Sequence, residues 1–349
     1  MPGGALEQEN IGSSSASTFV GQKLDQHRGA FFLSHPMDKG HVQDGSFDDM
    51  EKIFEHVYSK HHLNAKTDEH PVLLTEAPMN PRANREQIAE LFFETYRAPA
   101  IFFSPPAVLS LYASGRATGV VLDVGEGVTH CVPVYEGYAL KHSITRSDVA
   151  GRDVTKQLQL LLRKSGLAFT TTAESDLVKT MKEELCYVHQ NVSGTDDRIK
   201  PGVGSSEDTA QAVYQLPDGQ TVSISNERHL APEVLFNPSL IGSEEVDVAS
   251  ALVNSIMKSD LDLRPTLFSQ IVLAGGSTCT SGFGDRLLTE VRAKAPTHTR
   301  IRISAPPDII HSAWAGGSIL ASLATFKNMW VTKAEYEEYG KEVLHRSGL

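Results

Sequence analysis

A glycine turn between two apolar segments near the middle of the chain constrains the fold more than any other feature. Residues 119–123 (Gly-Val-Val-Leu-Asp) read as a buried strand, Gly125-Glu126-Gly127 as a tight turn, and residues 128–135 as the returning strand. Helical and extended patterns alternate along the chain around this turn, which favours an α/β architecture. We therefore predict an α/β fold that contains this hairpin.

The pattern of apolar residues predicts the other elements. Strands are expected at 72–75, 101–103, 212–216, 221–224, 270–274 and 300–304. Helices are expected at 50–57, 81–92, 109–112, 154–165, 177–185, 248–257, 283–291 and 312–325. Ser46 and Asp49 form a Ser-x-x-Asp capping signal before the first helix, and Asn80 is expected to cap the second with Pro81 at its first position.

Composition narrows the class of protein. The 349 residues suggest two domains or one large bilobal unit, and the net charge of -11 argues against non-specific binding to nucleic acid. No apolar run reaches the length of about 18 residues that a membrane-spanning helix needs. Three cysteines without a Cys-x-x-Cys pair fit a reducing compartment. We expect a soluble, acidic, intracellular protein, with segments 12–18 and 191–209 loose in solvent.

The common catalytic signatures are missing. The chain has no Gly-x-x-x-x-Gly-Lys-Ser/Thr loop, no His-Glu-x-x-His and no Gly-x-Ser-x-Gly, and its 14 histidines are scattered. Two glycine turns remain as candidate sites. In the first, Asp123 can approach a magnesium ion through water, while Gly125 and Gly127 let backbone N–H groups close around phosphate oxygens. In the second, Gly275-Gly276 follows a buried strand and could let adenine pack on bare backbone. Either turn could equally be an ordinary structural corner.

Five runs of sequence resemble the actin family: residues 70–78, 107–113, 150–153, 182–187 and 317–323. The resemblance extends from about residue 21 to the last residue. It implies an α/β, actin-like fold of the duplicated ribonuclease-H type, with two lobes around a nucleotide cleft. It also implies four parts: a mobile small subdomain, a large outer subdomain, an inner subdomain and a second outer subdomain. Their expected bounds are, in that order, 1–35, 36–113 with 313–349, 114–150 with 244–312, and 151–243.

The resemblance assigns one wall of the cleft to named residues. It implies that the first turn is one of two phosphate-binding hairpins, that residues of two later helices line the ribose and adenine, and that the second turn closes over the nucleotide. The cofactor would be ATP or ADP with Mg²⁺, which Asp123 would hold weakly through water. The implied residues are Asp123, Gly125, Gly127, Val128, His130, Gly151, Arg152, Lys182, Glu183, Gly275, Gly276 and Ser277.

The chain also departs from the family pattern. No Asp-x-Gly-x-Gly occurs upstream of Asp123, so the other phosphate hairpin and its lysine are not found, and we expect the first strands of the large lobe to be missing. Pro106 stands where the family has the glutamine that orients the attacking water, and proline has no side-chain donor or acceptor. The remaining substituted positions are Val124, Glu126, Cys279, Thr280 and Ile310. We expect weak or absent nucleotide binding, negligible ATP hydrolysis and no catalytic residue.

Within the family, residues 268–276, 282–291, 300–306 and 331–338 resemble the centractin branch of the actin-related proteins. This implies a cytoplasmic, cytoskeletal subunit of a dynactin-type complex, linked to dynein and microtubule-based transport. Its partners would be other actin-related subunits, dynactin and dynein components, and further copies of itself in short filaments, with no nucleic acid and no inserted membrane segment. Segment 236–242, with Leu240 and Ile241 at its tip, resembles the loop that bridges filament strands; a buried loop is the alternative.

Three other interpretations stay open. A monomeric actin-related scaffold in a nuclear chromatin-remodelling complex would tolerate a decayed nucleotide site. An enzyme of the sugar-kinase and chaperone ATPase superfamily would share the fold, although its substrate-domain motifs are not found. A gene model that starts too late would place the missing phosphate hairpin upstream of Met1.

Overall fold

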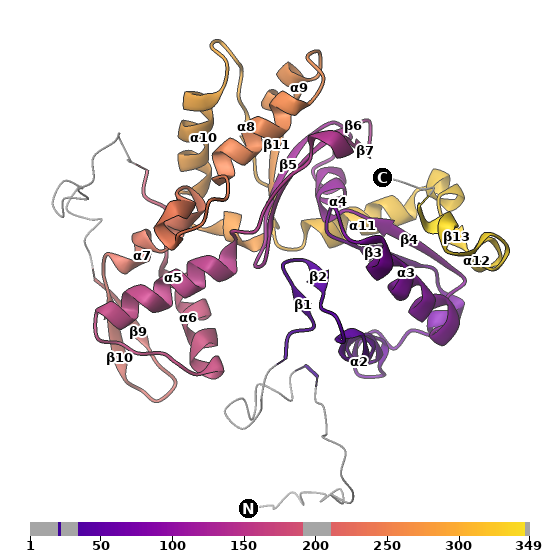
Figure 1. Cartoon of the computed structure of the whole chain (residues 1–349), viewed down its shortest axis with the longest axis horizontal. Coiled ribbons are helices and arrows are strands. Elements are labelled where there is room, and N and C mark those ends of the chain that lie inside the picture. Colours follow the sequence, from indigo (N-terminus) through magenta and orange to yellow (C-terminus); the bar gives the residue numbers. More distant parts are fainter. Residues whose placement is uncertain (1–19, 22–33, 191–210, 346–349) are drawn as a thin grey trace, which may run out of the picture.

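The computed structural model describes residues 20–21, 34–190 and 211–345. The segments predicted to be loose, 12–18 and 191–209, lie outside these residues, as does nearly all of the predicted small subdomain 1–35. Two lobes are visible in Figure 1. We call residues 34–113 and 312–345 the first lobe, on the right of the figure, and residues 119–304 the second lobe, at its top and left.

The second lobe is built on a six-stranded mixed sheet. Its strands are β5 (Gly119–Val124), β6 (Thr129–Tyr135), β7 (Tyr138–Ala139), β8 (Thr145–Ser147), β11 (Ile271–Ala274) and β12 (Ile303–Ser304). β5 pairs antiparallel with β6 through the predicted glycine turn and parallel with β11, while β8 pairs with β6 on its other side. Because β11 is parallel to β5, the ends of both strands, and hence both predicted glycine turns, meet at one edge of the sheet.

Helices and a hairpin complete the second lobe. α5 (Gly151–Lys164) and α6 (Thr172–Leu185) follow the sheet strands in sequence, and the β9–β10 hairpin (Ala212–Gln215, Thr221–Ile224) lies beside them in Figure 1. The sheet is also covered by α8 (Val248–Lys258), α9 (Arg264–Ser269) and α10 (Phe283–Lys294). Short helical turns, α7 (Glu227–Leu230), η5 (Pro232–Leu235) and η6 (Pro238–Ile241), connect the hairpin to α8.

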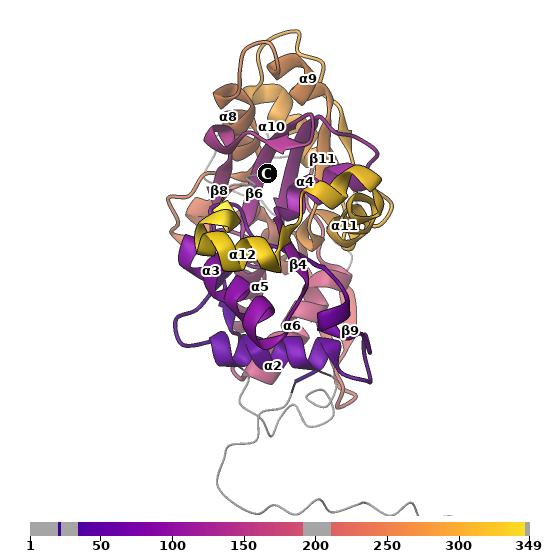
Figure 2. The same cartoon turned by 90° about the vertical axis from the view of Figure 1, so that its right-hand side faces the viewer.

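The first lobe has a three-stranded sheet in the order β13-β4-β3. β3 (Val72–Thr75) is parallel to β4 (Ala100–Ser104), and β13 (Val331–Thr332) is antiparallel to it. Around the sheet lie α2 (Phe47–Tyr58), α3 (Arg82–Glu90), α4 (Pro106–Ala113), α11 (Ser312–Ser322) and α12 (Lys333–Tyr339). Figure 2 shows α12 and α11 of this lobe nearest the viewer, in front of the sheet of the second lobe.

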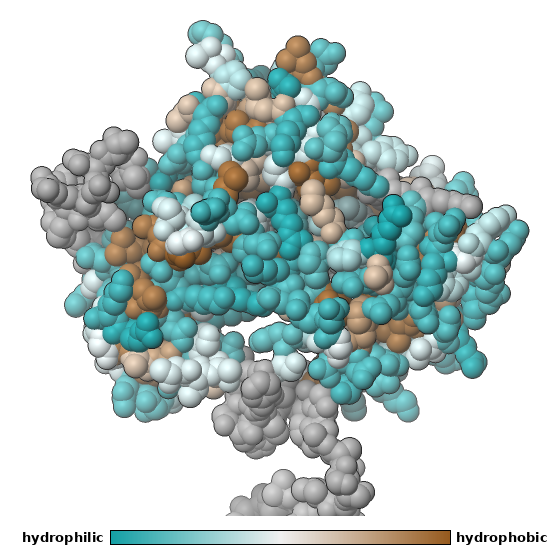
Figure 3. Space-filling view, viewed as in Figure 1, coloured by the Kyte–Doolittle hydropathy of each residue, from teal (hydrophilic) through white to brown (hydrophobic). Residues whose placement is uncertain are grey.

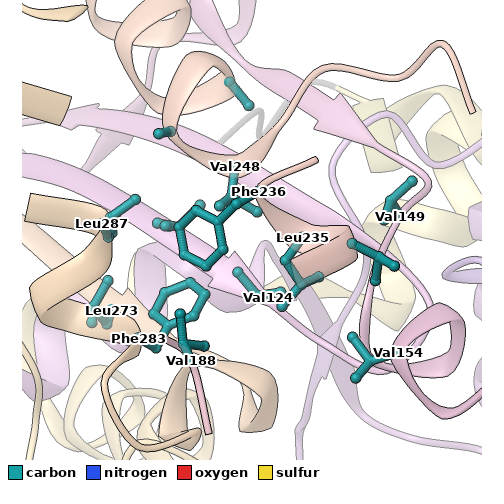
Figure 4. Close-up of a cluster of buried hydrophobic side chains, with 14 of the residues drawn as sticks. Val124, Val149, Val154, Val188, Leu235, Phe236, Val248, Leu273, Phe283 and Leu287 are labelled. Carbon is teal, nitrogen blue, oxygen red and sulfur yellow. The ribbon is translucent and has the colours of Figure 1, made fainter. Parts of the chain in front are cut away.

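The cores of the two lobes meet at α4. In the second lobe, apolar side chains from the sheet, α5, α8 and α10 form one large cluster, part of which is drawn in Figure 4 with Phe236 beside Phe283. α4 packs its Val108 and Leu111 against Val121 and Val132 of the neighbouring sheet. On another side, Leu109 of α4 joins the core of the first lobe. Burying each such side chain contributes about 1.5–3 kcal/mol, so α4 is an apolar joint between the lobes.

Two predicted helix caps are wrong. Ser46 precedes α2, but its backbone (φ -100°, ψ 8°) is not extended and its hydroxyl caps nothing, while Asp49 binds Lys52 instead. α3 begins at Arg82 with Pro81 before it, and Asn80 uses its side chain elsewhere: its amide nitrogen donates to Glu76 at 3.2 Å. The predicted strands 72–75 and 221–224 have the bounds of β3 and β10, and the other predicted helices and strands are present with shifted ends.

Candidate functional site

The glycine turn after β5 lies where three segments converge. The Gly125 carbonyl oxygen accepts hydrogen bonds from the Gly151 N–H at 3.0 Å and from the Ser277 hydroxyl at 2.9 Å. The Glu126 carbonyl oxygen accepts one from the Arg152 N–H at 2.7 Å. The start of α5 and the short helix η7 (Gly276–Cys279) after β11 are therefore both hydrogen-bonded to the turn.

Glycine is required here by close packing. A Cβ at Gly151 would lie 2.6 Å from the Ser277 hydroxyl oxygen and 3.1 Å from the Gly125 carbonyl oxygen. A Cβ at Gly275 would lie 2.3 Å from the Val124 carbonyl oxygen, and Gly275 has φ +82°, which other residues rarely adopt. By contrast, a Cβ at Gly276 would meet no atom within 4 Å. Residues of both predicted turns thus form one compact site with open space beside Gly276.

Asp123 and His130 are the polar side chains at the floor of this site. They are opposite each other on β5 and β6. Desolvation raises the pKa of Asp123 from 3.8 to about 6, and desolvation with the nearby charges of Arg146 and His41 lowers the pKa of His130 from 6.5 to about 4. His130 is buried, and its Nε2 has no hydrogen-bond partner in the described part of the chain. An unpartnered polar atom at such a depth indicates that a polar ligand or water fits there.

The predicted side chains on α5 and α6 behave differently from one another. Lys182 reaches the turn: its Nζ donates to the Gly151 carbonyl oxygen at 3.1 Å and lies 3.3 Å from a carboxylate oxygen of Glu126. The guanidinium of Arg152 instead pairs with Asp38 of the first lobe. Glu183 is exposed on α6, and no contact places it at the turn. The structure thus brings Lys182 to the site, whereas Arg152 is engaged by the opposite lobe.

The substituted positions are also located. Pro106 is the first residue of α4, a position that suits proline because the N–H it lacks would have no helical partner. Cys279 is exposed at the end of η7, and Thr280 donates its hydroxyl hydrogen to the Ser277 carbonyl oxygen at 3.0 Å. Ile310 is 66% exposed just before α11. Proline at 106 therefore starts the helix well but offers nothing to orient a water molecule.

A second hairpin, which the sequence did not assign to the site, lies against the turn. β1 (Met37–Asp38) and β2 (His41–Val42) form a short antiparallel pair in the first lobe, and Figure 1 shows it between the lobes. A Cβ at Gly127 would lie 3.4 Å from Cα of Lys39, so the tips of the two hairpins are in contact. Arg146 binds this hairpin across more than a hundred residues of sequence, a distance over which spacing carries no signal.

The residues present fit one side of a nucleotide with its cation. The backbone cradle of the turn, the space beside Gly276, the desolvated carboxyl of Asp123 and the unpartnered His130 nitrogen form a polar site with room for a ligand. Among residues 20–21, 34–190 and 211–345, no group of three or more His, Cys, Asp or Glu side chains is arranged to hold a metal ion. Asp123 could therefore hold Mg²⁺ only with water or phosphate supplying the other ligands.

The family of the chain follows from its fold and its sequence. Residues 5–348 match the family model described as Actin, and the chain belongs to the actin family. The mixed α/β structure, with several sheets and two lobes, agrees with the actin-like fold. The chain is 50% identical over 336 residues to an "Actin-like protein" of Neurospora crassa, which covers 96% of this chain and 87% of that protein. Members of this family generally bind ATP or ADP with a divalent cation.

No helix in the described ranges is both long and apolar enough to cross a bilayer.

Proposed function

We propose that this actin-family protein is a structural subunit that acts through contacts with other actin-related subunits, as a centractin-type component of a dynactin-like complex. The observation that carries the proposal is an exposed apolar tip on the loop at η6. Leu240 is 47% and Ile241 36% exposed, on a turn between two well-packed segments. Exposing two adjacent large aliphatic side chains is costly in water, and a partner that covers them removes the cost.

The tip is held in place by the residues around it. Pro238 at its base is buried, and the Gly242 N–H donates to the Ser239 carbonyl oxygen at 3.0 Å with Gly242 in the left-handed region. The Ser239 hydroxyl donates to the Asn237 side chain at 2.6 Å. A preformed tip loses little conformational entropy on binding, which favours its use as a contact.

We further propose that the nucleotide site is degenerate and that hydrolysis is negligible. Phosphoryl transfer depends on positioning the attacking water and stabilising charge, and Pro106 can do neither. Lys182 and the glycine turn support retention of weak ATP or ADP binding. Their hydrogen bonds are made within the second lobe, so no residue of the first lobe is needed to hold them in place. The proposed role thus rests on surfaces rather than on chemistry.

Assembly can be tested with two matched variants. Leu240→Glu places a charge on the tip, and Val213→Glu places one on an even more exposed side chain (62%) of β9. Purified parent protein should form short filaments in negative stain and sediment as oligomers, Leu240→Glu should remain monomeric, and Val213→Glu should behave as the parent. A monodisperse parent monomer would contradict filament formation. If such a monomer captured chromatin-remodelling subunits instead of dynein and dynactin components, the nuclear scaffold would be favoured.

The nucleotide site can be tested separately. A fluorescent ATP analogue titrated with Mg²⁺ should bind weakly or not at all, and release of inorganic phosphate should stay at background. Pro106→Gln restores a side chain able to orient water and is the variant in which a rise in phosphate release is expected. Brisk phosphate release by the parent protein would overturn the proposal of a degenerate site.

A further inference from the structure

The sheet of the first lobe ends in an edge strand. β3 is paired with β4 on one side, and no strand among the described residues pairs with its other side. Proteins usually protect such an edge with a charged residue, a proline or a bulge within the strand. The sequence of β3, Val-Leu-Leu-Thr, contains neither a charged residue nor a proline. The edge is therefore able to pair with a further strand.

The pairing with β4 shows which backbone groups of β3 face outward. The Glu76 N–H donates to the Ser104 carbonyl oxygen at 3.2 Å, so Glu76 and the residues two and four positions before it face β4. Successive residues of a strand direct their N–H and C=O groups to opposite sides. Leu73 and Thr75 therefore direct theirs away from β4, and no backbone hydrogen bond within the described ranges reaches them. An extended segment beside β3 would pair with both residues.

Helix α11 presents an apolar flank beyond this edge. Gly316 faces α4, where its Cβ would meet Leu109, and a Cβ at Gly317 would lie 3.6 Å from Leu73 Cδ2 on β3. Each helical residue is rotated by about 100° from the one before it. Trp314 therefore lies about 60° further around the helix than Gly317, in the direction that leads from α4 to β3. Its side chain is on the flank of α11 that continues past β3.

Such an exposed apolar flank is uncommon on this molecule. The face drawn in Figure 3 is mostly hydrophilic, and apolar side chains appear on it only in small groups. Trp314 is 76% exposed, and Ile310, just before α11, is 66% exposed. Large apolar side chains exposed together are typical of surfaces that bind a partner. A segment placed beside β3 would cover Trp314 and at the same time satisfy the outward backbone groups of the strand.

The second lobe shows how a comparable edge is covered. Each lobe has a parallel pair of strands with a helix after each strand, β3-α3-β4-α4 in the first and β11-α10-β12-α11 in the second. The other side of β11 is taken by β5, which runs parallel to it and has residues 120–122 fully buried. By this comparison, the segment that fits beside β3 is extended, mainly apolar and parallel to β3.

We propose that the open edge of β3, with Trp314 beside it, is a docking site for an extended, mainly apolar segment of a partner protein, which adds a parallel strand to this sheet. Main-chain hydrogen bonds to Leu73 and Thr75 supply affinity, and the alternate side chains that face Trp314 supply specificity. The site uses neither the tip at η6 nor the glycine turns. The proposal therefore does not depend on filament assembly or on nucleotide binding.

A dye-labelled synthetic peptide serves as the probe. It has the sequence of residues 118–125, which include β5, with lysines added at both ends for solubility. Titration with the parent protein should give a saturable rise in fluorescence anisotropy. Trp330→Phe leaves Trp314 as the sole tryptophan, and its emission should shift to the blue when the peptide covers it. The amide hydrogens of Leu73 and Thr75 should exchange rapidly without the peptide and slowly with it.

Thr75 offers a matched pair of variants. Its side chain is exposed and its N–H points away from β4, so Thr75→Pro removes an outward donor but no hydrogen bond to β4. This variant should bind the peptide about tenfold or more weakly than the parent. Thr75→Val keeps the N–H and should bind as the parent does. Circular dichroism checks that both variants are folded.

A pair of modified peptides gives a test that needs no variant of the protein. N-methylation of every second residue removes the N–H groups on one side of the peptide strand only. Methylation on the side that faces β3 should abolish binding, whereas methylation of the other residues should leave it unchanged. Equal binding of the two methylated peptides, or equal binding by folded Thr75→Pro and Thr75→Val, would overturn the proposal.

The same measurements detect the other possible occupants of the edge. If the amide hydrogens of Leu73 and Thr75 exchange slowly in the parent alone and the peptide does not bind, the edge is already covered. Sedimentation then distinguishes a second copy, which gives a dimer, from another part of the same chain, which leaves a monomer. Either result would overturn docking of a partner segment, as would rapid exchange at both residues without saturable peptide binding.

Discussion

Asp123 and His130 face each other across β5 and β6, and burial acts on them in opposite directions. The pKa of Asp123 is raised from 3.8 to about 6, so the folded state holds this proton more tightly than the unfolded state, and stability falls as the pH rises through that interval. The pKa of His130 is lowered from 6.5 to about 4, so stability falls as the pH drops through that interval. In the parent protein the two effects offset each other.

Single substitutions should reveal these opposing contributions. Each of these two pKa shifts corresponds to a change in the free energy of unfolding of about 3 kcal/mol over its full pH interval. Between about pH 7 and about pH 4.5, His130→Gln should therefore gain about 2 kcal/mol of stability relative to the parent on acidification, and Asp123→Asn should lose a similar amount. Urea unfolding at the two pH values measures both, with His70→Gln as the control. If the stabilities of the two variants change with pH in the same way, burial does not shift the pKa values of Asp123 and His130 in opposite directions.

The sequence predicted only part of the site at this scale. Asp123, Gly125, Gly151, Lys182, Gly275 and Ser277 were expected together and the structure places them together. The residues that it failed to predict are those of the hairpin contact, among them Asp38, Lys39 and His41. Their partners in the second lobe lie more than a hundred residues away, and a pairing between isolated polar groups has no periodicity or spacing from which it could be inferred.

Among the elements, the sequence predicted strands better than caps. A run such as 72–75 gives a strand because its three consecutive apolar side chains are partly buried in the core of the first lobe, and a local sequence pattern reflects this. A cap depends on one backbone conformation. Thr171 and Thr332 have the extended backbone that allows their hydroxyls to accept from Glu174 and Glu335, whereas Ser46 does not. Similar capping sequences thus form a cap at Thr171 and Thr332 and none at Ser46.

The contact between α11 and α4 gives a prediction at this scale. A Cβ at Gly316 would lie 1.7 Å from the Leu109 carbonyl oxygen, so Gly316→Ala must push the helices apart, at a cost of about 2 kcal/mol or more. A Cβ at the next residue, Gly317, would meet Leu109 Cδ1 at 3.4 Å, an ordinary contact. Gly317→Ala should be neutral or stabilise the helix by up to about 1 kcal/mol. Urea unfolding of the two variants measures this difference in stability. Equal unfolding midpoints would mean that α11 and α4 do not pack as closely as described.

At the scale of the whole molecule, the two lobes are joined by contacts of two physical kinds. α4 buries apolar side chains against the sheet of the second lobe, a contact that salt leaves intact. The contact of the β1–β2 hairpin with the second lobe is polar, and the side chains of its ion pair, Asp38 and Arg152, are 44% and 36% exposed. The family resemblance predicted two lobes, but not what holds them together, because that depends on side chains brought close only by the finished fold.

The two kinds of contact should respond differently to salt. Screening of partly exposed charges strengthens as the Debye length falls from about 10 Å at 0.1 M salt to about 3 Å at 1 M. Raising the salt over this range should therefore open the lobes and increase the radius of gyration measured by X-ray scattering, while circular dichroism stays constant because each lobe keeps its apolar core.

Charge reversal tests whether the hairpin is the contact that salt weakens. Arg152→Asp faces Asp38 with a like charge, so this variant should be open already at low salt. The double variant Arg152→Asp with Asp38→Arg restores an opposite pair and should close again, which a merely damaged α5 would not do. The matched control is Lys66→Glu, which breaks an exposed pair with Glu69 inside the first lobe and should leave the radius unchanged. If the double variant stays as open as Arg152→Asp, the ion pair does not hold the lobes together.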